Sequence, residues 1–272
     1  MKDLLKLYSI HSVSETPEEK EICDWICKRL DDFKVDYKRV DNTIYHIGKD
    51  NKALLSAHLD QVATKGKAVH FYKVANRYIY GYNSNFQRTS LGADDKNGVW
   101  LILKLLEKGK EFDFIISESE EVGCVGIKKI EQEIKNSKAD YCIVLDRRDN
   151  NEILNKGSAT NYCKCLADNL KNFLNRDYKV SSGTLSDTQT ISKYIESVNM
   201  SVAYFNPHTA KEFTDFERLE IIKKDLEDIL DYFVHYPAPV EDYQTASHYP
   251  SYYNKNESYY DSDYWNNYGD IK

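Results

Sequence analysis

Two kinds of apolar pattern alternate along residues 1–236. Short runs rich in β-branched and aromatic residues predict strands, whereas apolar residues at three- and four-residue spacing predict helices. The expected strands are 35–40, 43–47, 53–57, 78–82, 112–117, 141–145, 152–154, 178–181 and 200–204. The expected helices are 17–33, 97–107, 127–134, 161–174, 188–195 and 216–234. This alternation predicts an α/β domain with a mostly parallel central sheet and helices on both faces.

The first of these helices carries a start signal. Thr16 is expected to be its N-cap, Pro17 its first-turn proline and Glu19 the acid of a capping box. We therefore expect the helix to begin at Pro17.

From Pro237 the composition changes. Residues 237–272 contain many tyrosines and acids but almost no aliphatic residues. Such a segment cannot bury a core and is expected to be disordered by itself. We predict a catalytic domain at 1–236 and a tail at 237–272, which either attaches the protein to a partner, has no role, or folds over the active site.

The overall charge limits the partners. The net charge is −7 with a pI near 5.6, so no basic stripe is expected to bind nucleic acid. No apolar run is long enough to span a membrane, and the first residues lack the pattern of a secretory signal. A cytoplasmic protein is expected.

The cysteines are scattered, and in such a protein we expect them to be reduced. A zinc site formed by Cys23, Cys27, Cys163 and Cys165 is disfavoured, because their C-x-x-x-C and C-x-C spacings are not typical of structural zinc sites. Packing in the core is the favoured interpretation.

Imidazole and carboxylate groups follow the predicted strands. Each group alone can be explained as a helix cap or a solvated side chain. Their repeated occurrence at the ends of strands is much less easily explained by chance. They are His58, Asp60, Asp94, Asp95, Glu120, Glu121, Asp146 and His208. Strand ends of an open α/β sheet line one crevice, where this much negative charge requires cations. Two divalent metals satisfy that need, and the donor types suit zinc, with manganese or cobalt as alternatives.

The segments HLDQV, GADDKNG, SEEVG, LDRR and NPHTAKEF resemble the signature segments of the co-catalytic two-zinc exopeptidases. That clan includes single-domain leucyl aminopeptidase-like enzymes and peptidase T. The resemblance implies a zinc aminopeptidase-like fold over residues 1–236.

The resemblance also implies roles for individual residues. His58, Asp94 and Asp146 would hold one metal, and Asp94 would bridge to a second one. Glu121 and His208 would complete the second site. Glu120 matches the general base that takes a proton from the attacking water. Asp60 matches the carboxylate that orients His58.

Some branches of the clan carry an inserted lid or dimerisation domain. The intervals from His58 to Asp94 and from Asp146 to Ser186 are too short for one. We therefore expect no inserted lid domain.

Candidates for substrate binding are less specific. Arg88 and Arg147 are either a clamp for a substrate carboxylate or members of surface ion pairs. Ser186 lies in the stretch SGTLSDTQT, which resembles a substrate-side turn of the clan. Asp187, in the same stretch, either lines the site or caps the following helix.

Three functions fit this sequence. The favoured one is a two-zinc metallopeptidase, an aminopeptidase acting on short peptides. An amidase or deacylase acting on an N-acyl or modified amino acid would use the same metals. A catalytically retired binding module is the third, although the chain keeps every residue of the motif.

Overall fold

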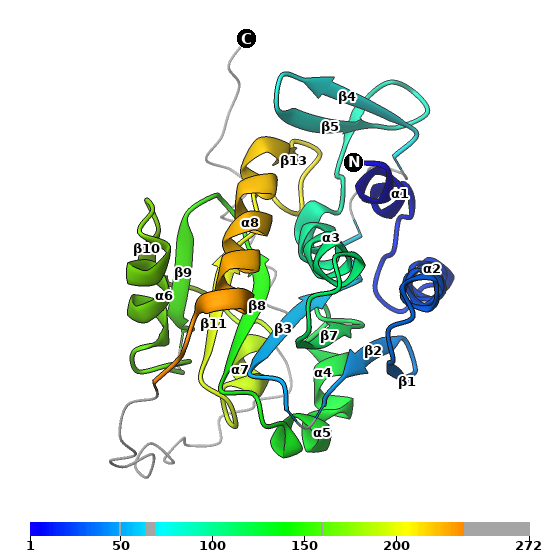
Figure 1. The fold of residues 1–272 in the computed structure, drawn as a ribbon. Helices are drawn as coiled ribbons and strands as arrows, with labels where there is room; N and C mark the ends of the chain where they lie inside the picture. Colours follow the sequence, from blue (N-terminus) through cyan, green and yellow to red (C-terminus); the bar gives the residue numbers. More distant parts are fainter. Residues whose placement is uncertain (49, 64–68, 159, 237–272) are drawn as a thin grey trace, which may run out of the picture. The chain divides into compact units, whose positions relative to one another are not determined.

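The computed structural model describes residues 1–48, 50–63, 69–158 and 160–236 (Figure 1). The predicted tail, 237–272, lies outside the described residues. The helices are α1 Lys2–Ser9, α2 Pro17–Phe33, α3 Ala93–Glu107, α4 Val125–Lys129, α5 Glu131–Asn136, α6 Leu166–Leu174, α7 Thr188–Ile191 and α8 Phe216–Tyr232. In the part of the chain that is described, no helix is long and apolar enough to cross a membrane.

The main sheet is mixed but mostly parallel at its centre. Its strands are β1 Lys38–Val40, β2 Thr43–His46, β3 Ala53–His58, β7 Asp113–Ser117, β8 Tyr141–Arg147, β9 Glu152–Lys156, β10 Lys179–Ser182 and β11 Ser197–Ser201. They are ordered β1-β2-β7-β3-β8-β11-β9-β10. Neighbours β7, β3, β8 and β11 run parallel, whereas β2 and β9 pair antiparallel with their inner neighbours. The predicted α/β class is confirmed.

Helices cover both faces of this sheet (Figure 1). On one face, α1, α2, α3, α6 and α8 pack on residues such as Leu55 and Ile143. On the other, α4, α5 and α7 pack on Leu54 and Val144. Successive side chains of a strand point to opposite faces, which explains why neighbouring residues belong to different clusters.

A second, smaller sheet was not predicted. Its strands are β4 Phe71–Ala75, β5 Tyr78–Tyr82, β6 Arg88–Thr89, β12 Tyr204–Phe205 and β13 Phe213–Asp215. The hairpin β4–β5 pairs with β13 from the far end of the domain. Only β5 was expected. The strands β6, β12 and β13 have two or three residues each, too few for a pattern, and β4 was missed. The chain between His58 and Asp94 thus forms part of this small sheet and no separate lid domain.

Several predicted boundaries were wrong where polar groups are buried. The strand expected at 200–204 begins at Ser197, because the Asn199 side chain is buried and hydrogen-bonded to Asp146 and Ser186. The helix expected from 161 begins at Leu166. Glu196 accepts hydrogen bonds from the backbone N–H groups just before it, which holds that start.

The start of α2 also differs from the prediction. Pro17 is its first residue and Thr16 precedes it, as expected. However, Glu19 does not close a capping box on Thr16. Its carboxylate accepts a hydrogen bond from the N–H of Glu15 (2.8 Å) and is otherwise turned into the protein.

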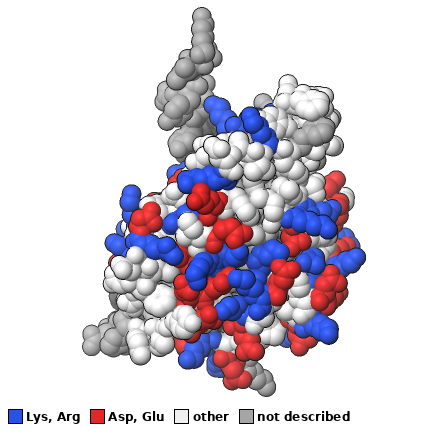
Figure 2. Space-filling model, turned by 45° about the horizontal axis from the view of Figure 1, so that its top comes forward, with Lys and Arg blue, Asp and Glu red and all other residues white. Residues whose placement is uncertain are grey.

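Acidic and basic side chains are mixed on the surface. On the face shown in Figure 2, Lys and Arg alternate with Asp and Glu and form no extended area of one sign.

Candidate metal centre

The predicted ligands lie at the carboxyl ends of the central parallel strands. His58 is the last residue of β3, Asp146 lies near the end of β8, and Glu121 follows β7. Asp94 lies in the first turn of α3, and His208 lies between β12 and β13. Because β7, β3 and β8 are parallel neighbours, their carboxyl ends meet at one edge of the sheet.

The side chains form two groups. His58 Nε2 lies 3.4 Å from Asp94 Oδ1 and 3.6 Å from Asp146 Oδ1. His208 Nε2 lies 3.1 Å from Asp94 Oδ2 and 2.9 Å from Glu121 Oε1. Each set of three offers ligand atoms within 4.8 Å of one another, and Asp94 belongs to both.

Asp60 connects the first group to the loop after β7. Its Oδ1 lies 3.3 Å from His58 Nδ1, and its side chain is fully buried. The two carboxylate oxygens accept hydrogen bonds from the N–H groups of Glu120 (2.9 Å) and Glu121 (3.1 Å). The Ser14 hydroxyl donates a further bond to it (2.7 Å). His58 Nδ1 also lies 3.0 Å from the backbone oxygen of Asp60. One buried residue therefore orients both an imidazole and the backbone that carries two acids.

The electrostatics of the centre favour a cation. Burial and the carboxylates of Asp94 and Glu121 raise the pKa of Asp146 to about 7, although His58 opposes this rise. Burial also raises the pKa of Glu121, and the charge of Asp94 adds to this rise, although the hydrogen bond with His208 opposes it. Asp94 Oδ1 is buried and lacks a hydrogen-bond partner in the described residues. Carboxylates that cannot all ionise together and an orphaned oxygen between them fit a pair of divalent ions.

Glu120 is a member of neither group. Its carboxylate belongs instead with the side chains of Cys124 and Asp187, with ligand atoms within 4.8 Å of one another. Cys124 Sγ lies 3.6 Å from Glu120 Oε1. Burial raises the pKa of Glu120 to about 9, and the charges of Asp146 and Asp187 add to this rise, although His58 opposes it.

The two arginines are held by other groups. Arg147 forms an ion pair with Glu152, at 2.6 Å between Nη2 and Oε2. Arg88 Nη2 donates to the backbone oxygens of Lys211 (2.9 Å) and Glu212 (3.1 Å), and the guanidinium lies over the Tyr80 ring. The structure therefore gives Arg147 an ion pair and Arg88 a contact with the loop that follows His208.

The turn before α7 is buried. Ser186 Oγ is 2.8 Å from Thr188 Oγ1 and accepts from the Asn199 side chain. Asp187 occupies the N-cap position of α7 but makes no capping hydrogen bond, so its interpretation as a helix cap was wrong. Instead, its carboxylate accepts from the Ser117 hydroxyl and lies beside Glu120.

Two buried acids near the centre were missed. Glu212 accepts hydrogen bonds from the Ser90 hydroxyl (2.5 Å), Gly92 N–H (2.8 Å) and Asp94 N–H (3.2 Å). Glu19 accepts from the N–H of Ser119 at 2.7 Å, next to Glu120. Glu212 lies in the quoted segment NPHTAKEF, which was a usable signal. For Glu19 the local pattern indicated a helix cap and nothing more.

Comparisons with known proteins agree with this fold. No protein-family model matches the chain. Uncharacterized protein YqjE of Bacillus subtilis is 27% identical over 174 residues, which cover 57% of this chain and 45% of that protein. The chain thus matches about half the length of this curated relative.

Among solved structures, aminopeptidase PepT from Bacillus cereus has a TM-score of 0.69 at 18% identity, covering 84% of this chain and 96% of that one. A tripeptidase from Staphylococcus aureus has a TM-score of 0.68 at 17% identity, with the same coverage. A Zn-dependent exopeptidase from Parabacteroides distasonis has a TM-score of 0.62 at 16% identity, covering 84% of this chain and 94% of that one. The chain therefore shares its fold with these peptidases, as the sequence motifs predicted.

Proposed function

We propose that the chain is a two-zinc metallopeptidase that hydrolyses peptide bonds, acting as an aminopeptidase on short peptides. The observation that carries this proposal is the pair of three-ligand groups that share Asp94. His58, Asp94 and Asp146 would hold one ion, and Asp94, Glu121 and His208 would hold the other. Manganese or cobalt would fit the same nitrogen and oxygen donors.

The mechanism follows from where the side chains lie. Zinc ions at such a centre supply water of lowered pKa and polarise the carbonyl of the substrate. Glu120, whose carboxylate lies outside both ligand groups, accepts the proton of the attacking water and passes it to the departing amine. Asp60 fixes the tautomer of His58 and, through two backbone hydrogen bonds, the position of Glu120 and Glu121.

The named relatives support a peptidase among the hydrolases. The structures with the same fold include an aminopeptidase, a tripeptidase and a Zn-dependent exopeptidase. For this chain we infer the same class of substrate, a short peptide with a free amino terminus.

The first test is metal removal. Dialysis against a chelator is expected to abolish hydrolysis, and zinc is expected to restore it, with two ions bound at His58, Asp94, Glu121, Asp146 and His208. The readouts are elemental analysis and turnover of aminoacyl, carboxypeptidase and N-acyl substrates. Turnover of only the N-acyl compounds would make the enzyme a deacylase. A protein that binds no metal at these residues would contradict the proposal.

A further inference from the structure

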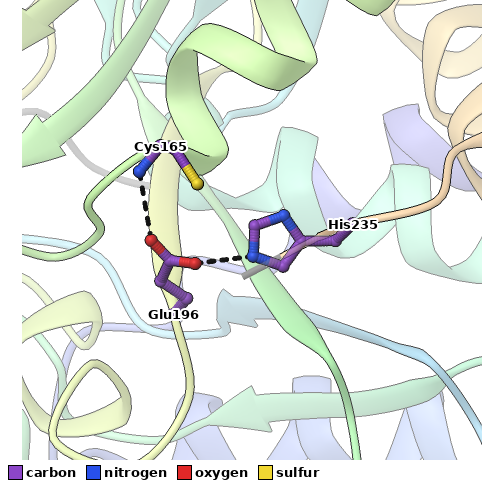
Figure 3. A group of neighbouring side chains, drawn as sticks. All are labelled: Cys165, Glu196 and His235. Atoms are coloured by element: carbon purple, nitrogen blue, oxygen red, sulfur yellow. Dashed lines mark hydrogen bonds and ion pairs between the residues drawn. The ribbon is translucent and has the colours of Figure 1, made fainter. Parts of the chain in front are cut away.

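A second cluster of metal-binding side chains lies outside the proposed centre. Cys165 directly precedes α6, Glu196 directly precedes β11, and His235 follows α8 (Figure 3). Their ligand atoms lie within 4.8 Å of one another. The cluster shares no residue with the two groups around Asp94.

Its hydrogen bonds fix the carboxylate and the imidazole. His235 Nε2 lies 2.6 Å from Glu196 Oε2. The other oxygen of Glu196 accepts from the N–H groups of Lys164 (2.5 Å) and Cys165 (3.2 Å). Figure 3 shows the thiol of Cys165 on the same side as the imidazole ring. Three separate segments therefore present sulfur, oxygen and nitrogen to one point.

An ordinary ion pair explains only part of this arrangement. It accounts for the contact between Glu196 and His235, which would fasten the end of α8 to the start of α6. It leaves the thiol unused. Among the described residues, Cys165 Sγ makes only a long contact, 3.7 Å to the carbonyl oxygen of Tyr236. The His235 side chain has no exposed surface, so the imidazole is held in place beside this thiol.

We propose that Cys165, Glu196 and His235 bind a single transition-metal ion, with zinc the best match. A thiolate, a carboxylate and a neutral imidazole are all zinc ligands, and the first two balance the charge of a divalent ion. With three protein ligands, water occupies the fourth position. Binding releases the thiol proton to solvent and moves the imidazole proton from Nε2 to Nδ1, which frees the Nε2 lone pair for the ion.

The geometry requires little movement. Bond lengths of about 2.0–2.3 Å place tetrahedral zinc ligands about 3.3–3.7 Å apart. The His235–Glu196 pair, at 2.6 Å, must therefore open slightly, and no pair in the cluster starts more than 4.8 Å apart. Side-chain rotations are sufficient for this change. The ion would join the end of α8 to α6 and β11 and would take no part in hydrolysis.

Cobalt provides a specific test, because the ligands proposed for the two-zinc centre include no cysteine. The full-length chain is stripped of metal and loaded with Co²⁺, and the thiolate-to-cobalt charge-transfer band is recorded in the near ultraviolet. We expect the band in the wild type and in Asp94→Asn, which disrupts the other centre. We expect Cys165→Ser and His235→Ala to lose the band and one ion per chain, with peptide turnover unchanged.

Two other thiols serve as controls. Cys163→Ser changes a half-buried cysteine two positions away and is expected to keep the band. Cys124 lies beside Glu120, so Cys124→Ser is the critical comparison. A band that survives Cys165→Ser, or one that disappears in Cys124→Ser, would overturn the proposal, as would a wild type that shows no band. None of these outcomes bears on the peptidase proposal, which is tested by turnover.

Discussion

Glu120 and Glu121 are neighbours in the sequence, yet their carboxylates face different partners. Glu121 lies 2.9 Å from His208, whereas Glu120 lies with Cys124 and Asp187. This difference supports the proposal that Glu121 binds a metal and Glu120 moves a proton. Their backbone N–H groups are held by the same Asp60, so a change in either side chain leaves the loop in place.

We expect Glu120→Gln to lower turnover by about 10²–10⁴-fold, the usual contribution of a general base, with metal content unchanged. Glu121→Gln is the matched variant and is expected to weaken metal binding, because it removes a charged ligand. Turnover and elemental analysis are measured on both. If Glu120→Gln loses metal and Glu121→Gln keeps it, the two roles are reversed.

Glu19 is a positioning residue for this loop. Its Oε1 accepts from Ser119 N–H (2.7 Å) and its Oε2 from Glu15 N–H (2.8 Å). In Glu19→Gln, either orientation of the amide places its NH₂ group against a backbone N–H. We expect a lower kcat with little change in KM, and a loss of stability of about 1–3 kcal/mol from one unsatisfied buried group.

The neighbouring Glu18 is exposed and provides the control. Glu18→Gln is expected to match the wild type in both kinetics and urea unfolding. If Glu19→Gln also matches the wild type in kinetics and in urea unfolding, the loop is held by Asp60 alone.

At the scale of elements, the approach of α3 to the sheet determines where Asp94 lies. Gly98 is in α3, and a Cβ at this position would lie 2.3 Å from the backbone oxygen of Leu145 in β8. It would also lie 2.6 Å from Asp95 Oδ2, the oxygen that accepts from the N–H of His58. The helix therefore packs at a distance that only glycine allows.

Helix propensity by itself predicts that Gly98→Ala stabilises α3 by about 1 kcal/mol. We expect the opposite, a loss of about 1–3 kcal/mol from overpacking, together with lower activity because His58 and Asp94 shift. Urea unfolding measures the first and turnover the second. Lys28→Ala, at an exposed position of α2, is the control and should change stability by less than about 0.5 kcal/mol. A more stable Gly98→Ala would show that α3 can move away from β8.

At the scale of the whole molecule, residues 237–272 are proposed to serve attachment and not hydrolysis. Aromatic side chains spaced by Ser, Asn and Asp offer contact area with a polar end to a partner. We expect a chain ending at Tyr236 to retain full turnover on small peptides and to lose binding to that partner. A large drop in turnover would instead place the tail at the active site.

The strands of the main sheet, most of the helices and the acids at strand ends could be read from the sequence because they are local patterns. Apolar spacing depends on neighbours within a few residues, and so does the position of His58 directly after β3. The fold class and the grouping of the five proposed ligands followed from these patterns and the resemblance.

Only the tertiary structure decided which partners the remaining polar groups find. Glu19 meets Ser119, Glu212 meets Asp94 and Cys165 meets His235, all across long stretches of chain. The same holds for Asp187, which faces Ser117 instead of capping α7. A buried polar side chain takes whichever donor or acceptor the packing of distant segments brings within reach, and no local pattern encodes that choice.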